Sequence, residues 1–261
     1  MSNDRPEYQQ KKRFFNRMLT IYGRNPVLEA LLDPKLKVHR LHLADSNKNN
    51  SQLNDMIRLA QQKHAEVLYH SKQELSRISR NSQQDQGVAL DVITEGFTNE
   101  ADFLAALPTT FELIALDNIT NPQNLGMIVR SVCASPLFGI LLPENGCAKL
   151  DALVIKASAG TLFKARIIRC ESLAKTLQQL QQQGTQVFGL DAKAPQTLGE
   201  FRAPPRTVMV MGNETHGLSV EIKKLCNGQL GIPMANGVES LNVSVAASLI
   251  AFRSLLGPQT H

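Results

Sequence analysis

The sequence has no tryptophan, only three tyrosines and only four cysteines among its 261 residues. The cysteines lie far apart and form no C-x-x-C pair; they are Cys133, Cys147, Cys170 and Cys226. This spacing excludes a standard zinc site and a dense disulfide scaffold, so we expect free thiols in a reducing, cytoplasmic compartment and no bound metal. We expect no membrane association, because no apolar run approaches the ~18–20 residues of a membrane span and the N-terminus lacks the apolar segment of a secretory signal.

The sequence also lacks any G-x-G triplet, which forms the core of the dinucleotide-binding motif G-x-G-x-x-G. This absence argues against dehydrogenases and against the commoner class of methyltransferase. No cysteine lies in a loop beside a candidate base, so we expect no thiolate attack on a pyrimidine base.

Basic residues outnumber acidic ones by 28 to 23, and part of the excess lies in the short N-terminal segment. Residues 1–17 hold five basic and two acidic side chains, a net charge of +3. A basic, polar tail indicates a polyanionic partner such as RNA, although a solvated, frayed terminus would have the same composition. We expect residues 1–18 to form a basic, flexible tail.

Short strand and helix patterns follow the tail as far as residue 95. The alternation in Lys37–Ala44 predicts a half-buried strand, and the apolar spacing over 51–65 predicts a helix. We therefore expect a small α/β domain over 19–95. The small and polar residues over 96–110 predict a linker or a connecting helix.

From residue 111 onward, apolar strands alternate with helices. The strand runs are LIAL, FGILLP, ARIIRC, QVFGLD, TVMVMG and QLGIP. Continuous apolar strands of this kind predict an α/β fold with a mostly parallel sheet that helices cover on both faces. The last helix, expected over 241–256, is apolar nearly all round, so we expect it to be deeply packed.

Three loops at strand-to-helix junctions attract attention, because open α/β sheets bind their ligands there. In the first loop, Asn121-Pro122 is a helix-start signal, which places Asn124 in the first turn and Arg130 about 9 Å farther along the axis. Asn124 is a candidate site residue, but helix capping is an alternative role for it. Arg130 is also a candidate site residue, and its alternative role is a structural salt bridge.

The second and third loops carry the other polar candidates. Residues 212–219 nearly match the phosphate-binding pattern G-x-x-x-x-G-K-[ST], but Leu218 replaces the lysine, which disfavours nucleotide hydrolysis. A plain turn with Ser219 as helix cap is the alternative. In the third loop, Ser240 and Asn242 lie at the edge of an apolar helix, where each polar group needs a partner, and Ser240 could simply cap that helix.

Taken together, these loops resemble a known family. NPQNLGMIVRS, MGNETHGLS and IPMANGVESLNVSVA resemble motifs one, two and three of the SpoU/TrmH branch of the SPOUT methyltransferases. IYGRNPVLEALL and DQGVALDV resemble the L30e-like substrate-binding domain of the 23S rRNA guanosine 2′-O-methyltransferase group. The resemblance covers nearly all of the chain except the first ~18 residues and the linker.

The resemblance implies an RNA substrate-binding domain over 19–95 and a methyltransferase domain over 111–261 whose C-terminal segment forms a deep trefoil knot. It implies S-adenosylmethionine as the methyl donor and a homodimer with the active site near its interface. The positions that match the family's cofactor contacts are Gly212, Ile232, Leu241, Leu190 and Met234. The positions that match its catalytic residues are Arg130, Asn124, Glu214, Ser240 and Asn242.

We therefore expect methylation of a ribose 2′-hydroxyl in structured RNA, with a guanosine of ribosomal RNA as the favoured target. Arg130, helped by a substrate phosphate, would stabilise the developing alkoxide, while the polar residues orient the ribose and Arg130. The alternatives are a tRNA ribose 2′-O-methyltransferase and a non-catalytic RNA-binding or ribosome-assembly protein. An RNA-facing strip of scattered basic residues is a further hypothesis; these are Lys149, Lys156, Lys164, Arg166 and Arg169.

Overall fold

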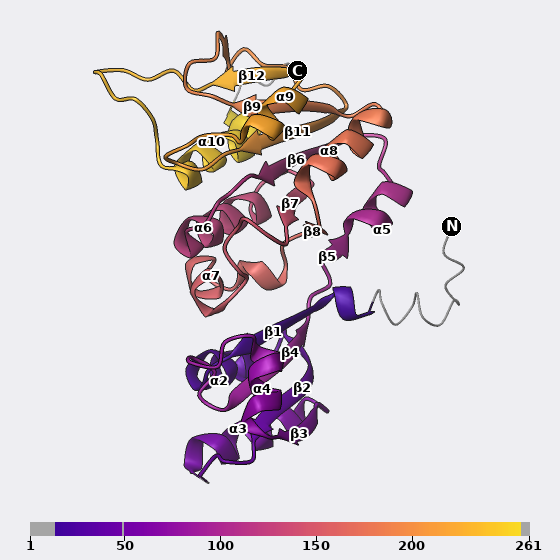
Figure 1. Ribbon diagram of the computed structural model, residues 1–261, viewed down its shortest axis with the longest axis vertical. Coiled ribbons are helices and arrows are strands. Elements are labelled where there is room, and N and C mark those ends of the chain that lie inside the picture. The colour runs from indigo at the N-terminus through magenta and orange to yellow at the C-terminus, as the bar shows by residue number, and fades with distance from the viewer. Residues whose placement is uncertain (1–13, 49, 257–261) are drawn as a thin grey trace. The chain divides into compact units, whose positions relative to one another are not determined.

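The computed structural model describes residues 14–48 and 50–256, and the chain divides into two compact units between Glu95 and Gly96 (Figure 1). Most of the predicted basic tail, residues 1–13, lies outside the described residues. The two units are described separately below. In the described part of the chain, no helix is long and apolar enough to cross a membrane.

In its described residues, the first unit is built from a four-stranded sheet and helices that pack on it. Its strand order is β1-β4-β2-β3, in which only the β2–β3 pair is parallel. The strands are β1 (Met18–Tyr22), β2 (Lys37–Ala44), β3 (Glu66–His70) and β4 (Val88–Ile93). The helices are α2 (Arg24–Leu32), α3 (Ser51–Gln62) and α4 (Lys72–Ser79).

Local signals define where these helices begin. The Asn50 side chain accepts a hydrogen bond from the backbone N–H of Leu53 at the start of α3. Ser71 and Glu74 form a capping box at the start of α4, in which each side chain accepts a hydrogen bond from the other residue's backbone N–H. Helix α3 therefore begins at Ser51, the first residue of the predicted helix over 51–65.

The second unit contains an eight-stranded sheet, in which every neighbouring pair of strands runs parallel. The strand order is β10-β12-β9-β11-β6-β7-β8-β5. The strands are β5 (Phe97–Asn99), β6 (Phe111–Leu116), β7 (Gly139–Pro143), β8 (Ile167–Cys170), β9 (Gln186–Leu190), β10 (Gln196–Thr197), β11 (Arg206–Met211) and β12 (Gly228–Gly231). The apolar runs of the sequence thus became the buried central strands, as expected for a sheet that is covered on both faces.

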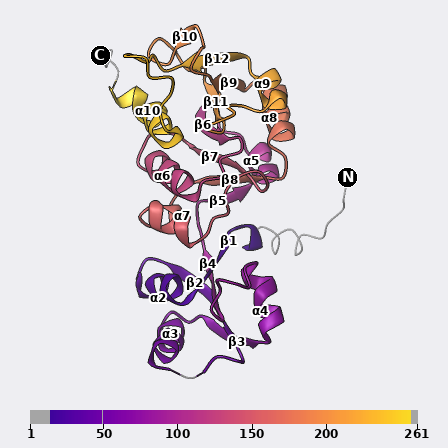
Figure 2. The same ribbon diagram turned by 60° about the vertical axis from the view of Figure 1, so that its left-hand side comes forward.

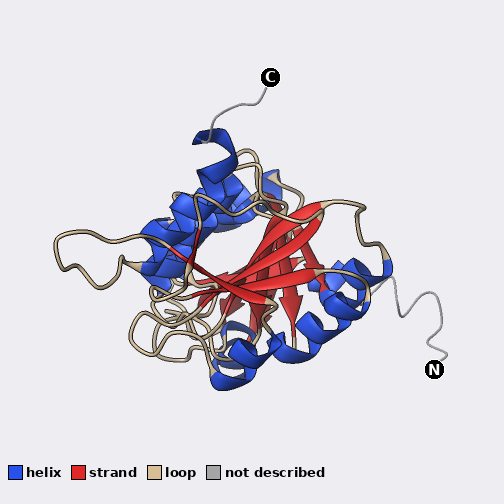
Figure 3. Cartoon of the chain, turned by 90° about the horizontal axis from the view of Figure 1, so that it is seen from above, coloured by secondary structure: helices blue, strands red, loops and turns tan. Residues whose placement is uncertain are grey.

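Helices cover both faces of this sheet. In Figure 2, α6, α7 and α10 lie on one side of the strands and α5, α8 and α9 on the other; Figure 3 shows helices on both sides of the red strands. The bounds are α5 (Glu100–Ala105), α6 (Pro122–Cys133), α7 (Ala152–Ala157), the 3-10 helix η1 (Thr161–Phe163), α8 (Leu173–Gln182), α9 (Val220–Leu225) and α10 (Val243–Leu256). The predicted α/β class with a mostly parallel sheet is therefore confirmed.

Residues 96–110 contain a short helix, one of the two predicted possibilities, but the segment is part of the second unit rather than a linker. β5 pairs with β8 at the edge of the large sheet, and the Asn99 side chain caps α5. The Phe103 ring is buried and meets the ring of Phe111 with the centroids 5.5 Å apart. A three-residue strand and a six-residue helix are too short to show a periodic pattern, so the sequence could not reveal that this segment belongs to the second unit.

Helix α10 packs on α6 along one face only. Val243, Ala247 and Ile250 are buried there, whereas Val245 is 47% exposed and Leu249 is 39% exposed. The expectation that this helix is deeply packed all round was therefore wrong. Its apolar composition reflects one face that meets α6 and a second apolar face that remains open to solvent.

Candidate functional site

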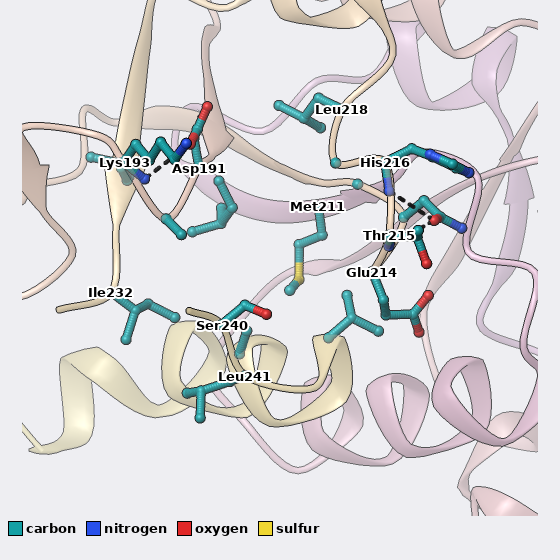
Figure 4. Close-up of a pocket in the computed structure, with 18 of the residues that line it drawn as sticks. Asp191, Lys193, Met211, Glu214, Thr215, His216, Leu218, Ile232, Ser240 and Leu241 are labelled. Atoms are coloured by element: carbon teal, nitrogen blue, oxygen red, sulfur yellow. Dashed lines mark hydrogen bonds between the residues drawn. The ribbon is translucent and has the colours of Figure 1, made fainter. Parts of the chain in front are cut away.

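Three loops surround a cavity of about 540 Å³ at the carboxyl ends of the central strands (Figure 4). Two of them, 190–193 and 212–219, follow the adjacent parallel strands β9 and β11, whereas the loop after β6, 117–121, contributes no lining residue. The third, 232–242, follows β12 and extends away from the sheet before α10 begins (Figure 1). Open parallel sheets bind ligands at this edge, so the cavity is the candidate functional site of the second unit.

The five positions predicted to contact a cofactor all line this cavity; they are Leu190, Gly212, Ile232, Met234 and Leu241. Gly212 allows a close approach of backbone to backbone. A Cβ atom at this position would fall 2.3 Å from the carbonyl carbon of Gly217 and 2.4 Å from the backbone nitrogen of Leu218. Only glycine fits here, because the obstructing atoms are backbone atoms that cannot rotate away.

The loop after β11 is a tight, internally bonded turn. Asn213 and Gly217 exchange two backbone hydrogen bonds, with N···O distances of 3.0 and 2.8 Å. The Asn213 side-chain oxygen also accepts hydrogen bonds from the backbone N–H groups of Thr215 and His216, at 2.9 and 3.2 Å. Glu214 is therefore presented from a rigid support.

A buried carboxylate joins this turn to the loop after β6. Asp117 accepts a hydrogen bond from the backbone N–H of Ser219 at 2.7 Å and another from the side chain of Asn118 at 2.9 Å. Asn213 in turn donates to the backbone carbonyl of Asn118 at 3.0 Å. Ser219 occupies the N-cap position of α9, as the alternative interpretation expected, but its side chain makes no capping hydrogen bond.

Three predicted catalytic residues form one hydrogen-bonded chain. The Asn124 Nδ2 group donates to Glu214 Oε1. The Asn242 Nδ2 group donates to Asn124 Oδ1 at 3.1 Å. Asn124 is buried, whereas Glu214 and Asn242 at its two sides are exposed. Ser240 and Glu214 also line the cavity, so this chain adjoins the space that the cofactor positions surround.

The side chains that cap α6 and α10 are not Asn124 and Ser240, which the sequence analysis gave as alternative capping residues. The Asn121 side chain caps α6 by accepting from the backbone N–H groups of Gln123 and Asn124, which leaves the Asn124 side chain for Glu214. Asn242, rather than Ser240, caps α10, because its side-chain oxygen accepts the backbone N–H of Ser244 at 2.8 Å. Both helices thus begin at the Asn124–Asn242 contact.

Two helix N-termini therefore meet beside the Glu214 carboxylate. The start of a helix carries a partial positive charge and unpaired N–H groups, which favour anions. The same environment would stabilise negative charge that develops on a bound substrate. Nothing in the described ranges resembles a metal centre, since no three histidine, cysteine or acidic side chains converge.

Arg130 stands apart from this chain. It lies on α6, is exposed, and its side chain forms no hydrogen bond or ion pair with any residue that the structure describes. The alternative of a structural salt bridge is therefore not seen. The structure also shows no contact through which Asn124, Ser240 or Asn242 would orient Arg130.

Sequence reasoning missed the charged residues at the other side of the cavity. Lys223 and Asp191 form an ion pair at 2.9 Å, and Figure 4 places Asp191 and Lys193 across the cavity from Glu214. The backbone N–H of Lys193 and the ammonium of Lys223 lower the pKa of the Asp191 carboxyl. The weak signal available was a polar residue directly after the apolar strand β9.

The cysteines are separate from this site chemistry. Burial raises the pKa of the Cys170 thiol to about 12 and that of the Cys226 thiol to about 11. Burial also raises the pKa of Cys147. These thiols remain protonated at neutral pH and are poor nucleophiles.

Comparison with known proteins identifies related families for both units. Residues 112–252 match the model of the SpoU rRNA Methylase family, and residues 20–95 match the model for RNA 2′-O ribose methyltransferase substrate binding. A Mycolicibacterium vanbaalenii protein named as an uncharacterized tRNA/rRNA methyltransferase is 36% identical over 235 residues, which cover 88% of this chain and 74% of the relative. A Mycobacterium avium protein of the same name is 36% identical over 233 residues, covering 88% and 75%.

Solved structures share the fold. The SpoU methyltransferase AviRb from Streptomyces viridochromogenes, in complex with AdoMet, has a TM-score of 0.62 at 21% identity and covers 97% of this chain and 93% of its own. An AdoMet-bound rRNA methyltransferase from Sinorhizobium meliloti has a TM-score of 0.61 at 22% identity, covering 97% and 95%. A structure described as concerning 2-OH methylation of C/U34 on tRNA has a TM-score of 0.51 at 25% identity, covering 57% and 96%.

Proposed function

Because this chain belongs to the SpoU rRNA methylase family, we propose that it transfers a methyl group from S-adenosylmethionine to a ribose 2′-hydroxyl of structured RNA. A guanosine of ribosomal RNA is the favoured target. The observation that carries the proposal is the position of the Glu214–Asn124–Asn242 chain at the edge of the cavity, with Glu214 belonging to both. Donor and acceptor sites of a transfer reaction must adjoin in this way.

The cavity suits the methyl donor in size and chemistry. Its volume of about 540 Å³ lies in the range of cofactor sites. Gly212 lets the backbone approach a ligand closely, and Ile232 and Leu241 supply apolar surface. The Asp191–Lys223 pair offers charges of both signs, which match the ammonium and carboxylate of an amino-acid moiety.

S-adenosylmethionine supplies an electrophilic methyl group on a sulfonium when it is bound. This chain must then position the ribose oxygen and assist loss of its proton, because a ribose hydroxyl is a weak acid. Glu214 and Asn242 are the exposed members of the hydrogen-bonded chain and orient the ribose, together with Ser240. The N-termini of α6 and α10 stabilise charge on the oxygen.

Arg130 contributes a cation that no described residue neutralises. A guanidinium stays protonated at neutral pH and binds phosphate through two parallel hydrogen bonds. Arg130 therefore holds a substrate phosphate and stabilises the alkoxide electrostatically. An exposed arginine without a protein partner is what such a role requires.

The first unit binds the RNA as an L30e-like domain, a proposal that its match to a substrate-binding model supports. The second unit carries the transfer site, and its C-terminal segment forms a trefoil knot. The exposed apolar face of α10, with Val245 and Leu249, supports a homodimer in which a second copy covers that face. The free cysteines suit a reducing, cytoplasmic location.

A tRNA ribose is the second candidate substrate, because one structural neighbour concerns 2-OH methylation of tRNA at 25% identity. The deciding experiment is transfer of a labelled methyl group from S-adenosylmethionine to total RNA from cells that lack this protein. Alkali-resistant linkages are then mapped, since a 2′-O-methyl group blocks cleavage at its own nucleotide. A single resistant site in rRNA supports the proposal and a site in tRNA supports the alternative. Absence of transfer, with donor binding verified, refutes both.

A further inference from the structure

The hydrogen-bonded chain at the site continues past Asn242 to Ser244 on α10. The Ser244 hydroxyl donates to Asn242 Oδ1 at 2.6 Å, and the Ser244 backbone N–H donates to the same oxygen at 2.8 Å. Ser244 is 4% exposed, so it cannot meet an RNA substrate directly. The proposed transfer reaction assigns it no role.

Every hydrogen bond in this chain is donated in the same direction, from Ser244 toward Glu214. A carboxylate accepts hydrogen bonds and a backbone N–H only donates. Asn124 and Asn242 must therefore both turn Nδ2 toward the Glu214 end and Oδ1 toward the Ser244 end. An amide flip at either asparagine would place two donors or two acceptors face to face at both of its contacts.

Buried and exposed members also alternate along the chain. Ser244 and Asn124 are buried at 4% and 6% exposure, while Asn242 and Glu214 are exposed. The buried members therefore hold the exposed members in place. Asn242 uses one Nδ2 hydrogen for Asn124 and keeps the other for a ligand.

We propose that Ser244 is a positioning residue that fixes the Asn242 amide for the substrate ribose; this rests on the proposed ribose methylation. Its hydroxyl is the second donor to Asn242 Oδ1, and two donors restrict the amide plane more tightly than the backbone N–H alone. The hydroxyl can be removed without removing the cap of α10, because the backbone N–H of Ser244 remains. A catalytic effect can therefore be separated from a structural one.

The test is the Ser244→Ala variant of the full chain, assayed with labelled S-adenosylmethionine and total RNA from cells that lack this protein. We expect kcat to fall about tenfold, the size of one well-oriented hydrogen bond. We expect KM for S-adenosylmethionine and the thermal midpoint to stay close to those of the wild type. Ser244→Thr, which keeps the hydroxyl, should restore most of kcat.

Ser248→Ala is the matched control on the same helix. The Ser248 hydroxyl pairs with Ser131 and with the backbone carbonyl of Ser244, outside the chain that leads to Glu214. We expect wild-type kcat for this variant. Equal losses in Ser244→Ala and Ser248→Ala, or a Ser244→Ala loss that Thr does not restore, would overturn the positioning role.

A double-mutant cycle tests the connection to Glu214. Glu214→Gln removes the acceptor-only group at the far end, so that only the backbone N–H of Ser244 still enforces the direction of the chain. Ser244→Ala should then reduce kcat by much less than tenfold in that background. A full tenfold reduction would show that Ser244 acts independently of the chain. A wild-type protein that transfers no methyl group would instead refute the proposed function itself.

Discussion

Gly212→Ala is the sharpest test of how the cavity is built. The new methyl group would meet the Gly217 carbonyl carbon at 2.3 Å and the Leu218 nitrogen at 2.4 Å, about 1 Å closer than van der Waals contact allows. The loop after β11 must therefore move by about that amount, which costs about 1–3 kcal/mol by analogy with overpacked cores. The same movement displaces Glu214, and misplacement by ~1 Å can lower a rate about a hundredfold.

Two assays follow from this estimate. Calorimetry with S-adenosylhomocysteine should show at least tenfold weaker binding to Gly212→Ala, and methyl transfer should fall further because Glu214 moves as well. Gly199→Ala is the matched control, because a Cβ atom there meets nothing within 4 Å and Gly199 has no positive φ. If Gly212→Ala bound the cofactor product with wild-type affinity, the close approach at this loop would not matter for the site.

Three further predictions concern other parts of the chain. Arg130→Ala should abolish methyl transfer and leave binding of S-adenosylhomocysteine unchanged, because Arg130 does not line the cavity and its side chain forms no hydrogen bond or ion pair with a described residue; a fully active variant would remove it from the mechanism. Leu249→Asp should convert a dimer into a monomer in size-exclusion chromatography with light scattering, and a monomeric wild type would contradict the proposed interface. Burial raises the pKa of Asp91, but hydrogen bonds from His42 and Thr20 outweigh it and hold the pKa below 3.8. The contribution of Asp91 to the free energy of unfolding is therefore present above pH ~4 and is lost as the pH falls through the folded-state pKa. Asp91→Asn should lower the free energy of unfolding by about 1–3 kcal/mol at pH 7. It should also flatten the dependence of the unfolding midpoint on acid pH.

The fold and the location of the site could be predicted from the sequence, because both depend on local signals. Apolar runs marked the buried strands, and Asn121-Pro122 marked the start of α6. The five expected cofactor positions came from the family resemblance, and the structure brings them to one cavity. Their role as cofactor contacts stays a prediction that the Gly212 variant tests for one of them.

The contacts that assemble the site could not be seen in the sequence. Asp117 and Ser219 are 102 residues apart, and Asn242 and Asn124 are 118 apart. No local pattern distinguishes an asparagine that caps its own helix from one that bonds a distant loop. For the same reason the sequence left capping open for Asn124, whereas the structure gives that task to Asn121.

The arrangement of the loops explains how this site can be built without a G-x-G motif. A dinucleotide-binding fold obtains close backbone approach and a helix N-terminus from one glycine-rich loop. Here the same elements come from separate places: Gly212 gives the close approach, and α6 and α10 give two helix N-termini. The two helix starts adjoin Glu214 and Asn242, at the edge of the cavity. Under the proposed ribose methylation, their positive ends would act where the alkoxide forms and would stabilise charge on the reacting oxygen.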